Sequence, residues 1–277
     1  MQLYLRMKPV FSHTVHVLGN TLHYIQNDTA GKPVVFLHGN SLSSSSFYKQ
    51  FEADWADDYR LIALDLVGHG KSSLAQNPEE VYTYAYFVQL VTHFLEALQL
   101  QDYVLVGHSM GGHIIMEGLP VWHGMCSFVL FGAPPAKQPL NIGEAFQPNE
   151  NLGLLFKPDL SEAEKELIID LYLSTPVADR AEILQQFSST DEAFRPHLGK
   201  NLALQDEAAL MQQNSLPVAI LEGVSEKLVT KGYIDSLGLP ALWRGQVQYI
   251  PEAGHSPQWE NPQAFNAVLG AFLQGVL

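Results

Sequence analysis

The chain has 277 residues, of which 47% are hydrophobic and 16% charged, and this composition excludes collagen-like, disordered and disulfide-rich proteins. Fifteen basic residues against 29 acidic ones give a net charge of −14, which repels phosphate backbones and anionic lipid heads. We therefore expect neither nucleic acid nor a membrane surface as a partner. The length favours one domain with an insertion over two independent domains.

The compartment is predicted from the N-terminus and from cysteine usage. The first residues lack the apolar stretch of a secretory signal peptide, and no window is apolar enough to cross a membrane. The single cysteine, Cys126, cannot form an internal disulfide, and the apolar run 128–131 beside it predicts a buried structural thiol. These features predict a cytoplasmic protein.

The predicted elements begin with an antiparallel hairpin, in which the alternating segments 14–18 and 22–26 flank Gly19 and Asn20. Short, continuously apolar runs then alternate with helical patterns, which is typical of a parallel sheet covered by helices on both faces. The predicted strands are 34–37, 61–64, 103–106, 128–131, 218–221 and 246–250. The predicted helices are 82–98, 110–118 and 262–273.

The stretch between the strands 128–131 and 218–221 contains helical patterns and no convincing strand. Ser161 and Glu164 have the spacing of a capping box at the start of a helix. The following turns place four residues on one helical face: Leu167, Ile168, Leu171 and Tyr172. Further helical segments are predicted at 179–187 and 203–214.

This helical stretch is also acidic, because residues 137–215 carry thirteen Asp or Glu against six Lys or Arg, half of the net charge. We expect it to be an inserted helical cap over residues 136–216. The catalytic core is then built from residues 1–135 and 217–277. The acidic lid predicts a small, neutral and largely apolar substrate.

The segment 105–113 joins a predicted buried strand to a predicted helix through a G-x-S-x-G sequence centred on Ser109. Such a sharp turn strains the central serine and projects its hydroxyl above the edge of the sheet. Side chains at Gly107 and Gly111 would collide in so tight a turn. The helix that begins at Met110 directs free N–H groups toward developing negative charge. Ser109 is therefore the predicted nucleophile.

A serine hydroxyl needs a base to become nucleophilic, and in this arrangement the chain order is serine, acid, histidine. Beyond the helix of Ser109 and the neighbouring segment 122–123, only His197 and His255 follow it in the chain. His197 lies within the expected cap. His255 follows the last predicted strand, where a loop reaches the carboxyl edge of the sheet, and is the predicted base.

The acid of the triad is predicted in the loop after the strand 218–221. Glu226 lies three residues past Gly223, in a loop that can return toward His255. Glu222 is the first alternative, although it sits at the strand end, and Asp235 is the second. Glu226 is the predicted acid.

The oxyanion hole requires two donors, and the backbone N–H of Met110 is the first. The second is predicted to be the N–H of Asn40, in the loop after the strand 34–37, where Gly39 permits close backbone approach. Asp65, in the loop after the strand 61–64, is expected to order its own turn. Three further residues are candidates for contact with the substrate: His38, which is also expected to brace its loop, Leu171 and Tyr172.

These motifs, in this order, resemble the α/β-hydrolase superfamily over nearly the whole chain. A serine nucleophile in place of aspartate separates the chain from the epoxide-hydrolase and haloalkane-dehalogenase branches. A closer resemblance is to the metal-independent N-acyl-homoserine lactonases of this fold, with which the chain shares glutamate as the acid. The stretches that carry it are 36–47, 68–72, 111–120, 132–137, 223–226 and 242–262.

The resemblance implies an α/β-hydrolase fold, with a mostly parallel sheet flanked by helices and an inserted helical cap. It implies a serine hydrolase that opens N-acyl-homoserine lactones through an acyl-enzyme, with neither cofactor nor metal ion. Leu167, Ile168 and Leu171 would line an acyl-chain tunnel and Tyr172 would donate to a substrate amide; ordinary packing is the alternative for these cap residues. Other functions that stay open are a general carboxylesterase, a C–C bond hydrolase or perhydrolase, and a non-catalytic ligand receptor.

Overall fold

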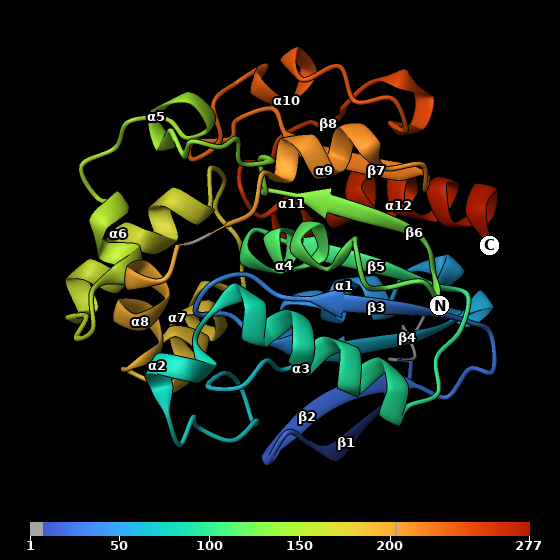
Figure 1. Ribbon diagram of the computed structural model, residues 1–277, viewed down its shortest axis with the longest axis horizontal. Coiled ribbons are helices and arrows are strands. Elements are labelled where there is room, and N and C mark those ends of the chain that lie inside the picture. The colour runs from blue at the N-terminus through green and yellow to red at the C-terminus, as the bar shows by residue number, and fades with distance from the viewer. Residues whose placement is uncertain (1–7, 203) are drawn as a thin grey trace, which may run out of the picture.

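An eight-stranded sheet forms the centre of the computed structural model, which describes residues 8–202 and 204–277 (Figure 1). Its strand order is β1-β2-β4-β3-β5-β6-β7-β8, with antiparallel pairing of β1 with β2 and of β2 with β4, and parallel pairing elsewhere. The strands are β1 (Val10–Val17), β2 (Asn20–Asn27), β3 (Lys32–Leu37), β4 (Tyr59–Leu64), β5 (Tyr103–His108), β6 (Met125–Phe131), β7 (Val218–Gly223) and β8 (Gln248–Ile250).

All the predicted strands and the N-terminal hairpin are confirmed, although most strands extend past their predicted ends. The reason is that polar residues at a strand end join the ladder without an apolar signal, as Lys32 does by pairing with Tyr59. The last strand is instead shorter than predicted and begins at Gln248. The N-terminal residues, for which no signal peptide is predicted, lie in part outside the described residues.

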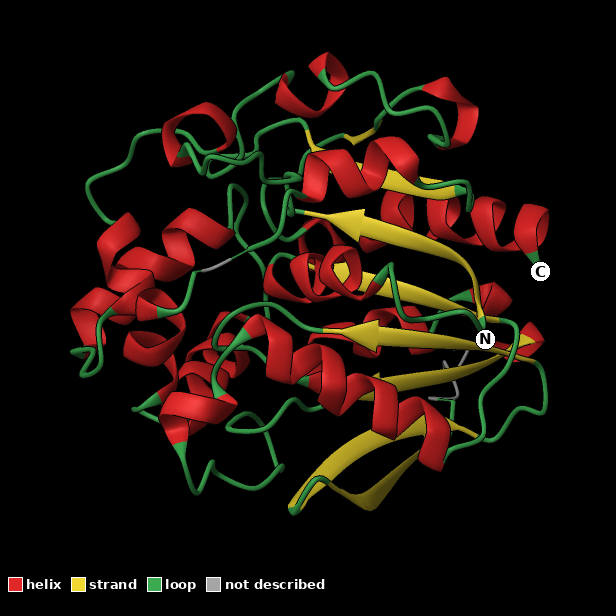
Figure 2. Ribbon diagram, viewed as in Figure 1, coloured by secondary structure: helices red, strands yellow, loops and turns green. Residues whose placement is uncertain are grey.

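Helices cover both faces of the sheet, as Figure 2 shows. Alternate residues of β3 divide between two hydrophobic clusters, so that Val35 and Leu37 pack on one face while Val34 and Phe36 pack on the other. The first cluster includes residues of α3 (Tyr84–Ala97) and α4 (Met110–Gly118), and the second includes residues of α12 (Pro262–Val276). Burial on both faces explains the unbroken apolar runs of the strands.

The predicted helix 82–98 begins two residues late because Thr83 is its N-cap, where the Thr83 hydroxyl accepts from the N–H of Tyr86. The predicted helix 110–118 is confirmed, and 262–273 continues to Val276. The remaining short helices of the core are α1 (Tyr48–Phe51), α2 (Pro78–Val81), α10 (Tyr233–Ser236) and α11 (Pro257–Glu260). Turns of 3-10 helix add η1 (Ser44–Phe47), η2 (Asp54–Asp58) and η4 (Trp243–Gly245).

The segment between β6 and β7 is a helical insertion. In Figure 1 its helices α5 to α8 lie beyond the sheet edge toward which the arrows of β3 and β6 point. Its elements are α5 (Ile142–Ala145), η3 (Leu152–Phe156), α6 (Glu162–Tyr172), α7 (Arg180–Ser189), α8 (Phe194–Lys200) and α9 (Glu207–Gln213). The insertion therefore covers the carboxyl ends of the parallel strands, where ligands bind in open α/β sheets.

Details of the insertion confirm some predictions and correct others. The capping box of Ser161 and Glu164 is present. Leu167 is 42% exposed, so it does not belong to the buried face of α6, where Ile169 is buried instead. The predicted helix 203–214 is shorter because α9 begins after its N-cap, Asp206, and residue 203 lies outside the described residues.

Two further findings concern the cysteine and membrane spans. Cys126 is only partly buried, so the prediction of a buried thiol is wrong. It lies where the register between β5 and β6 shifts, since Tyr103 pairs with Met125 and Val104 with Ser127, and its Sγ donates to the carbonyl of Tyr103 at 3.3 Å. In the described part of the chain, no helix is both long and apolar enough to cross a bilayer.

Candidate active site

Ser109 sits at the sharp turn between β5 and α4. Its backbone is strained, with φ of 49° and ψ of −115°, a conformation that few non-glycine residues adopt. A Cβ at Gly107 would lie 2.6 Å from the backbone N of Gly112, and one at Gly111 would lie 2.2 Å from the carbonyl O of Leu37. The turn is therefore possible only with glycine at both positions, as predicted.

The His255 ring is fixed from several sides. Its Nδ1 lies 3.0 Å from Oε2 of Glu226, and its backbone carbonyl accepts a hydrogen bond from Nε2 of His108 at 3.0 Å. A Cβ at Gly132, where φ is +63°, would lie 2.7 Å from Cε1 of His255. The His255 side chain is 1% exposed, and its Nε2 has no hydrogen-bond partner among the described residues. That atom is therefore free to accept a proton in the cavity.

Glu226 is held in position by its own loop. Its Oε1 accepts from the backbone N–H of Leu228 at 2.7 Å, while Gln147 Nε2 donates to the Glu226 carbonyl at 3.1 Å. Burial raises the pKa of this carboxyl, but the His255 ring and the backbone N–H groups outweigh burial, so the net pKa is lowered. Glu226 is therefore an anion beside Nδ1, which keeps the proton on that nitrogen.

The alternative acids lie elsewhere. Glu222 is buried at the end of β7, its Oε2 has no partner among the described residues, and no hydrogen bond joins it to His255 there. Burial, together with the negative charges of Glu226 and Asp235, raises the pKa of Glu222 to about 8. Asp235 accepts a hydrogen bond from the exposed hydroxyl of Tyr249. Of the three carboxyls considered, the structure brings only Glu226 to the imidazole.

The loop that follows β3 passes close to Ser109. A Cβ at Gly39 would lie 3.3 Å from Cβ of Ser109 and 3.0 Å from Nδ1 of His108, so any larger residue would crowd this approach. The next N–H, of Asn40, and the N–H of Met110 donate to no other group within the described residues. Two free N–H groups thus flank Ser109, the arrangement an oxyanion hole requires.

A cavity of about 250 Å³ opens on this site, and Ser109, His255, Asn40, Met110 and Tyr172 all contribute to its wall. Most of the remaining wall is apolar and comes from the insertion, including Leu140, Phe146, Leu152, Leu155, Phe156 and Leu198. The charged side chains on the wall, Lys137 and Glu144, are paired with each other and partly exposed. The cavity therefore suits a largely apolar, uncharged ligand.

Two predicted substrate contacts are wrong. His38 is fully buried away from the cavity, where its Nδ1 donates to the Gly39 carbonyl at 2.8 Å and its Nε2 accepts from the N–H of Leu66 at 3.0 Å. It braces the loop, as also predicted. Leu171 is buried with Ile168 in the core of the insertion, because that face of α6 packs inward rather than toward the cavity.

Tyr172 does line the cavity, but its hydroxyl is already occupied. It donates to the backbone carbonyl of Asn40 at 3.2 Å, and its ring centroid lies 5.3 Å from that of His255. Tyr172 therefore links the insertion to the loop of Asn40 and to His255.

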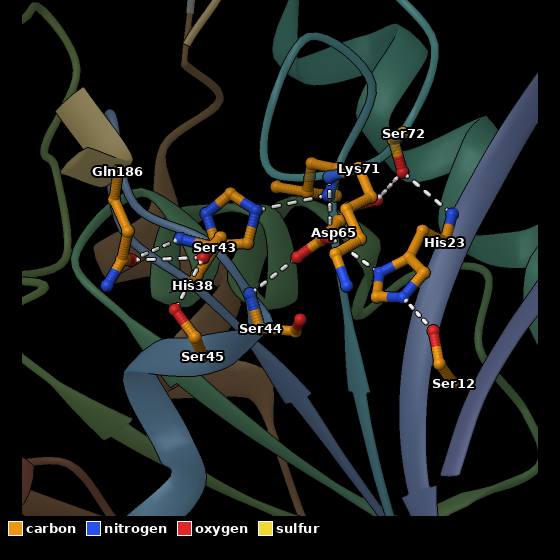
Figure 3. Close-up of polar contacts among 11 residues, drawn as sticks. Ser12, His23, His38, Ser43, Ser44, Ser45, Asp65, Lys71, Ser72 and Gln186 are labelled. Atoms are coloured by element: carbon orange, nitrogen blue, oxygen red, sulfur yellow. Dashed lines mark hydrogen bonds and ion pairs between the residues drawn. The ribbon is translucent and has the colours of Figure 1, made fainter. Parts of the chain in front are cut away.

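Asp65 orders the turn after β4, as predicted, and Figure 3 shows that it does more. It accepts from the N–H of Lys71 at 2.9 Å and of Ser44 at 2.6 Å, and it lies 2.7 Å from Nδ1 of His23. Burial alone would raise the pKa of Asp65, but these hydrogen bonds have the larger combined effect, so the net pKa is lowered. One buried carboxylate thus joins β2, the turn and the start of η1.

Figure 3 also shows a contact between the serine-rich segment and the insertion. The serine-rich segment, residues 43–46, lies at the start of η1. Oε1 of Gln186, on α7, accepts from the N–H of Ser43 at 2.9 Å and from the hydroxyls of Ser43 and Ser46 at 3.1 Å each. Gln186 is 5% exposed, so this contact is a buried tie between insertion and core.

The residues that sequence reasoning missed are three polar side chains at one end of the cavity. His113, on α4, and Tyr84, on α3, line the wall, and Glu207, on α9, lies behind His113 with both carboxylate oxygens 2.9 Å from Nδ1. The spacing of His113 from Ser109 is a signal for a shared helix face. The pairing with Glu207 leaves no local signal, because 94 residues separate the partners.

Comparisons with known proteins agree with the fold. The sequence model of the Alpha/beta hydrolase family matches residues 34–268. A 2-hydroxy-6-oxononadienedioate/2-hydroxy-6-oxononatrienedioate hydrolase of Paraburkholderia phymatum is 28% identical over 290 residues, which cover 95% of each chain. The AB hydrolase superfamily protein YisY of Bacillus subtilis is 25% identical over 256 residues, covering 90% of this chain and 94% of its own.

Solved structures include the N-acyl homoserine lactonase AidH complexed with N-butanoyl homoserine. It superimposes with a TM-score of 0.90 at 26% identity, covering 96% of this chain and 97% of its own. A mutant of that lactonase, complexed with N-hexanoyl homoserine, gives a TM-score of 0.91 over 97% of this chain. The fold, the strained serine turn and the family match over residues 34–268 lead to one conclusion: the chain belongs to the alpha/beta hydrolase family.

Proposed function

We propose that the protein hydrolyses the lactone ring of N-acyl homoserine lactones through an acyl-enzyme on Ser109. The observation that carries this proposal is one largely apolar cavity that holds Ser109, His255 bonded to Glu226, and two free backbone N–H groups. The likeness to a lactonase of known structure supports the choice of substrate. Residues 136–216 act as the cap that selects the acyl chain.

The first half of the reaction forms the acyl-enzyme. Oγ of Ser109 attacks the lactone carbonyl carbon while Nε2 of His255 takes the hydroxyl proton. The negative charge that develops on the carbonyl oxygen is stabilised by the N–H groups of Asn40 and Met110. When the ring C–O bond breaks, His255 returns the proton to the leaving alkoxide, which stays attached to the acyl group as a hydroxyl.

The second half releases the product. His255 takes a proton from water, the hydroxide attacks the ester carbon, and the bond to Oγ breaks as that proton passes to Ser109. The product is the open N-acyl homoserine. The anionic Glu226 stabilises the imidazolium in both halves because it keeps the proton on Nδ1 and lies 3.0 Å from it.

The character of the cavity separates this proposal from C–C bond hydrolysis. The Paraburkholderia phymatum relative acts, by its name, on a dienedioate, which is a dicarboxylate. The cavity here offers no free cation for such a ligand among its described lining, since Lys137 is paired with Glu144. A neutral amide-bearing lactone needs no cationic partner.

A substrate panel tests the proposal. Hydrolysis of N-acyl homoserine lactones with four to ten acyl carbons is followed by proton release at constant pH. The matched open ester is the methyl ester of N-hexanoyl-2-aminobutyrate, and p-nitrophenyl esters of equal acyl length complete the panel. We expect kcat/KM of about 10⁴ M⁻¹s⁻¹ or more for the preferred lactone, and at least about tenfold less for the methyl ester. Turnover of p-nitrophenyl esters without turnover of any lactone would show a general carboxylesterase instead.

A further inference from the structure

The cavity contains a second polar end, away from the triad. Three buried polar side chains of the wall are already satisfied: the amide of Asn40 donates to the Leu155 carbonyl at 3.0 Å, and the hydroxyls of Tyr172 and Tyr233 donate to backbone carbonyls. His113 and Tyr84 differ. They are 6% and 5% exposed, yet Nε2 of His113 and Oη of Tyr84 have no hydrogen-bond partner among the described residues.

Glu207 determines what His113 can offer. Its carboxylate is fully buried, lies 2.9 Å from Nδ1 of His113 through both oxygens, and accepts from the N–H of Ala136 at 2.8 Å. Burial, with a smaller contribution from the negative charge of Glu117, raises the net pKa of Glu207 although the His113 ring and the Ala136 N–H oppose the rise. When Glu207 is ionised it can only accept, so the proton of a neutral His113 ring belongs on Nδ1. Nε2 is then an acceptor, on a residue that lines the cavity.

Tyr84 supplies the complementary group. Its ring packs edge-on to the His113 ring, with centroids 6.1 Å apart. Both residues line the cavity, and a phenol hydroxyl can donate a hydrogen bond, so the pair supplies one acceptor and one donor. A secondary amide presents one N–H and one carbonyl, which is the matching arrangement.

The distance from the nucleophile fits the amide of an acyl homoserine lactone. Ser109 is the N-cap of α4 and His113 lies four residues further on, which places their backbones about 6 Å apart along the helix axis. In the lactone, the amide nitrogen is bonded to the carbon next to the carbonyl that Ser109 attacks. A group about one helical turn from Ser109 therefore meets the amide rather than the end of the acyl chain.

We propose that His113, oriented by Glu207, and Tyr84 form an amide-recognition subsite, with Nε2 of His113 accepting the substrate N–H and Oη of Tyr84 donating to the amide carbonyl. This inference rests on the proposed function and extends it, since it assigns selectivity for N-acyl substrates to named groups. Glu207 is a positioning residue. Tyr172, the amide donor expected from the sequence, is replaced in that role because its hydroxyl is bound to Asn40.

The test uses two activated esters of equal length that differ only in the amide. They are the p-nitrophenyl ester of N-hexanoylglycine, whose amide lies next to the reacting carbonyl, and p-nitrophenyl nonanoate. Their ratio of kcat/KM reports amide recognition even if no lactone is hydrolysed, so failure of the subsite and failure of the lactonase proposal are distinguishable. We expect the wild type to favour the amide ester by about tenfold or more.

Two variants remove one group each. Tyr84→Phe deletes only the hydroxyl, and His113→Asn keeps a donor near Nδ1 for Glu207 while it deletes Nε2. Each should lower the ratio by about fivefold to tenfold, because the amide ester loses a hydrogen bond that the nonanoate never makes. The matched controls are Tyr86→Phe, also on α3 but bonded to Asn20, and His123→Asn, which is exposed. Equal losses for both esters, or an unchanged ratio in Tyr84→Phe, would overturn the subsite.

Discussion

The hydroxyl of Tyr172, on helix α6 of the insertion, donates a hydrogen bond to the backbone carbonyl of Asn40, 3.2 Å away. This contact joins the insertion to the loop that carries the N–H of Asn40. The same Tyr172 ring lies against His255, so one side chain contacts both the base and the proposed oxyanion loop.

We expect Tyr172→Phe to lower kcat by about threefold to tenfold while KM changes little, because the loop loses a hydrogen bond that orients it but the apolar wall is unchanged. Steady-state kinetics with N-hexanoyl homoserine lactone measure both constants. Tyr86→Phe is the control and should leave both as in the wild type. A rise in KM at constant kcat would show that Tyr172 binds substrate instead of orienting the loop.

The choice between the two glutamates at the end of β7 is open to a direct test. Glu226→Gln should lower kcat/KM by about 10³-fold to 10⁴-fold, because a neutral amide neither holds the proton on Nδ1 nor stabilises the imidazolium. Glu222→Gln, at a carboxyl with no hydrogen bond to His255 in the described residues, should change kcat/KM by less than about threefold. The reverse order of these losses would assign the acid to Glu222.

Glu222 also makes stability depend on pH. Because burial and the neighbouring carboxylates raise its folded pKa to about 8, the folded state keeps a proton that the unfolded state loses near its ordinary value. Its contribution is therefore fully present below about pH 4.5 and is lost as the pH rises through about 8.

We expect Glu222→Gln to gain stability relative to the wild type as the pH rises from 5 to 8, by about 2–4 kcal/mol in the free energy of unfolding. Urea denaturation at the two pH values measures this difference. The control is Glu79→Gln, at an exposed acid of α2, which should show no such trend. A constant difference between Glu222→Gln and wild type at both pH values would refute the assignment.

The hydrogen bonds between Gln186 of the insertion and the serines of the core should contribute to the free energy of unfolding. Gln186→Leu leaves the N–H of Ser43 and the hydroxyl of Ser46 without their buried acceptor, which should cost about 1–3 kcal/mol. Gln186→Glu keeps an acceptor oxygen and should recover part of this loss. Thermal or chemical denaturation of the wild type and the two variants measures the loss of stability. Equal losses in both variants would mean that the acceptor oxygen of Gln186 does not stabilise the fold.

The core, the turn around Ser109 and the contact between His255 and Glu226 were predictable because their signals are local. Each buried strand is a short apolar run, and the turn around Ser109 requires glycines whose spacing is visible in the chain. His255 and Glu226 follow from the order of elements, because loops at the carboxyl ends of parallel strands meet at one edge of the sheet.

The insertion was less predictable because its roles depend on docking. Leu167 and Ile169 differ by two positions on one helix, and only the packed structure shows that the second is buried. His113 was set aside as a residue of the nucleophile's own helix, yet its partner Glu207 comes from the far end of the insertion. His38 had the correct structural role but not the substrate contact.

The central claim is that Ser109 is the nucleophile of a lactonase. Its most direct test is kcat/KM for N-hexanoyl homoserine lactone in the wild type and in Ser109→Ala, each with and without a metal chelator. We predict a loss of at least about 10³-fold in Ser109→Ala and no effect of the chelator on the wild type. Retention of more than about a tenth of the activity in Ser109→Ala, or loss to the chelator that zinc restores, would contradict the account.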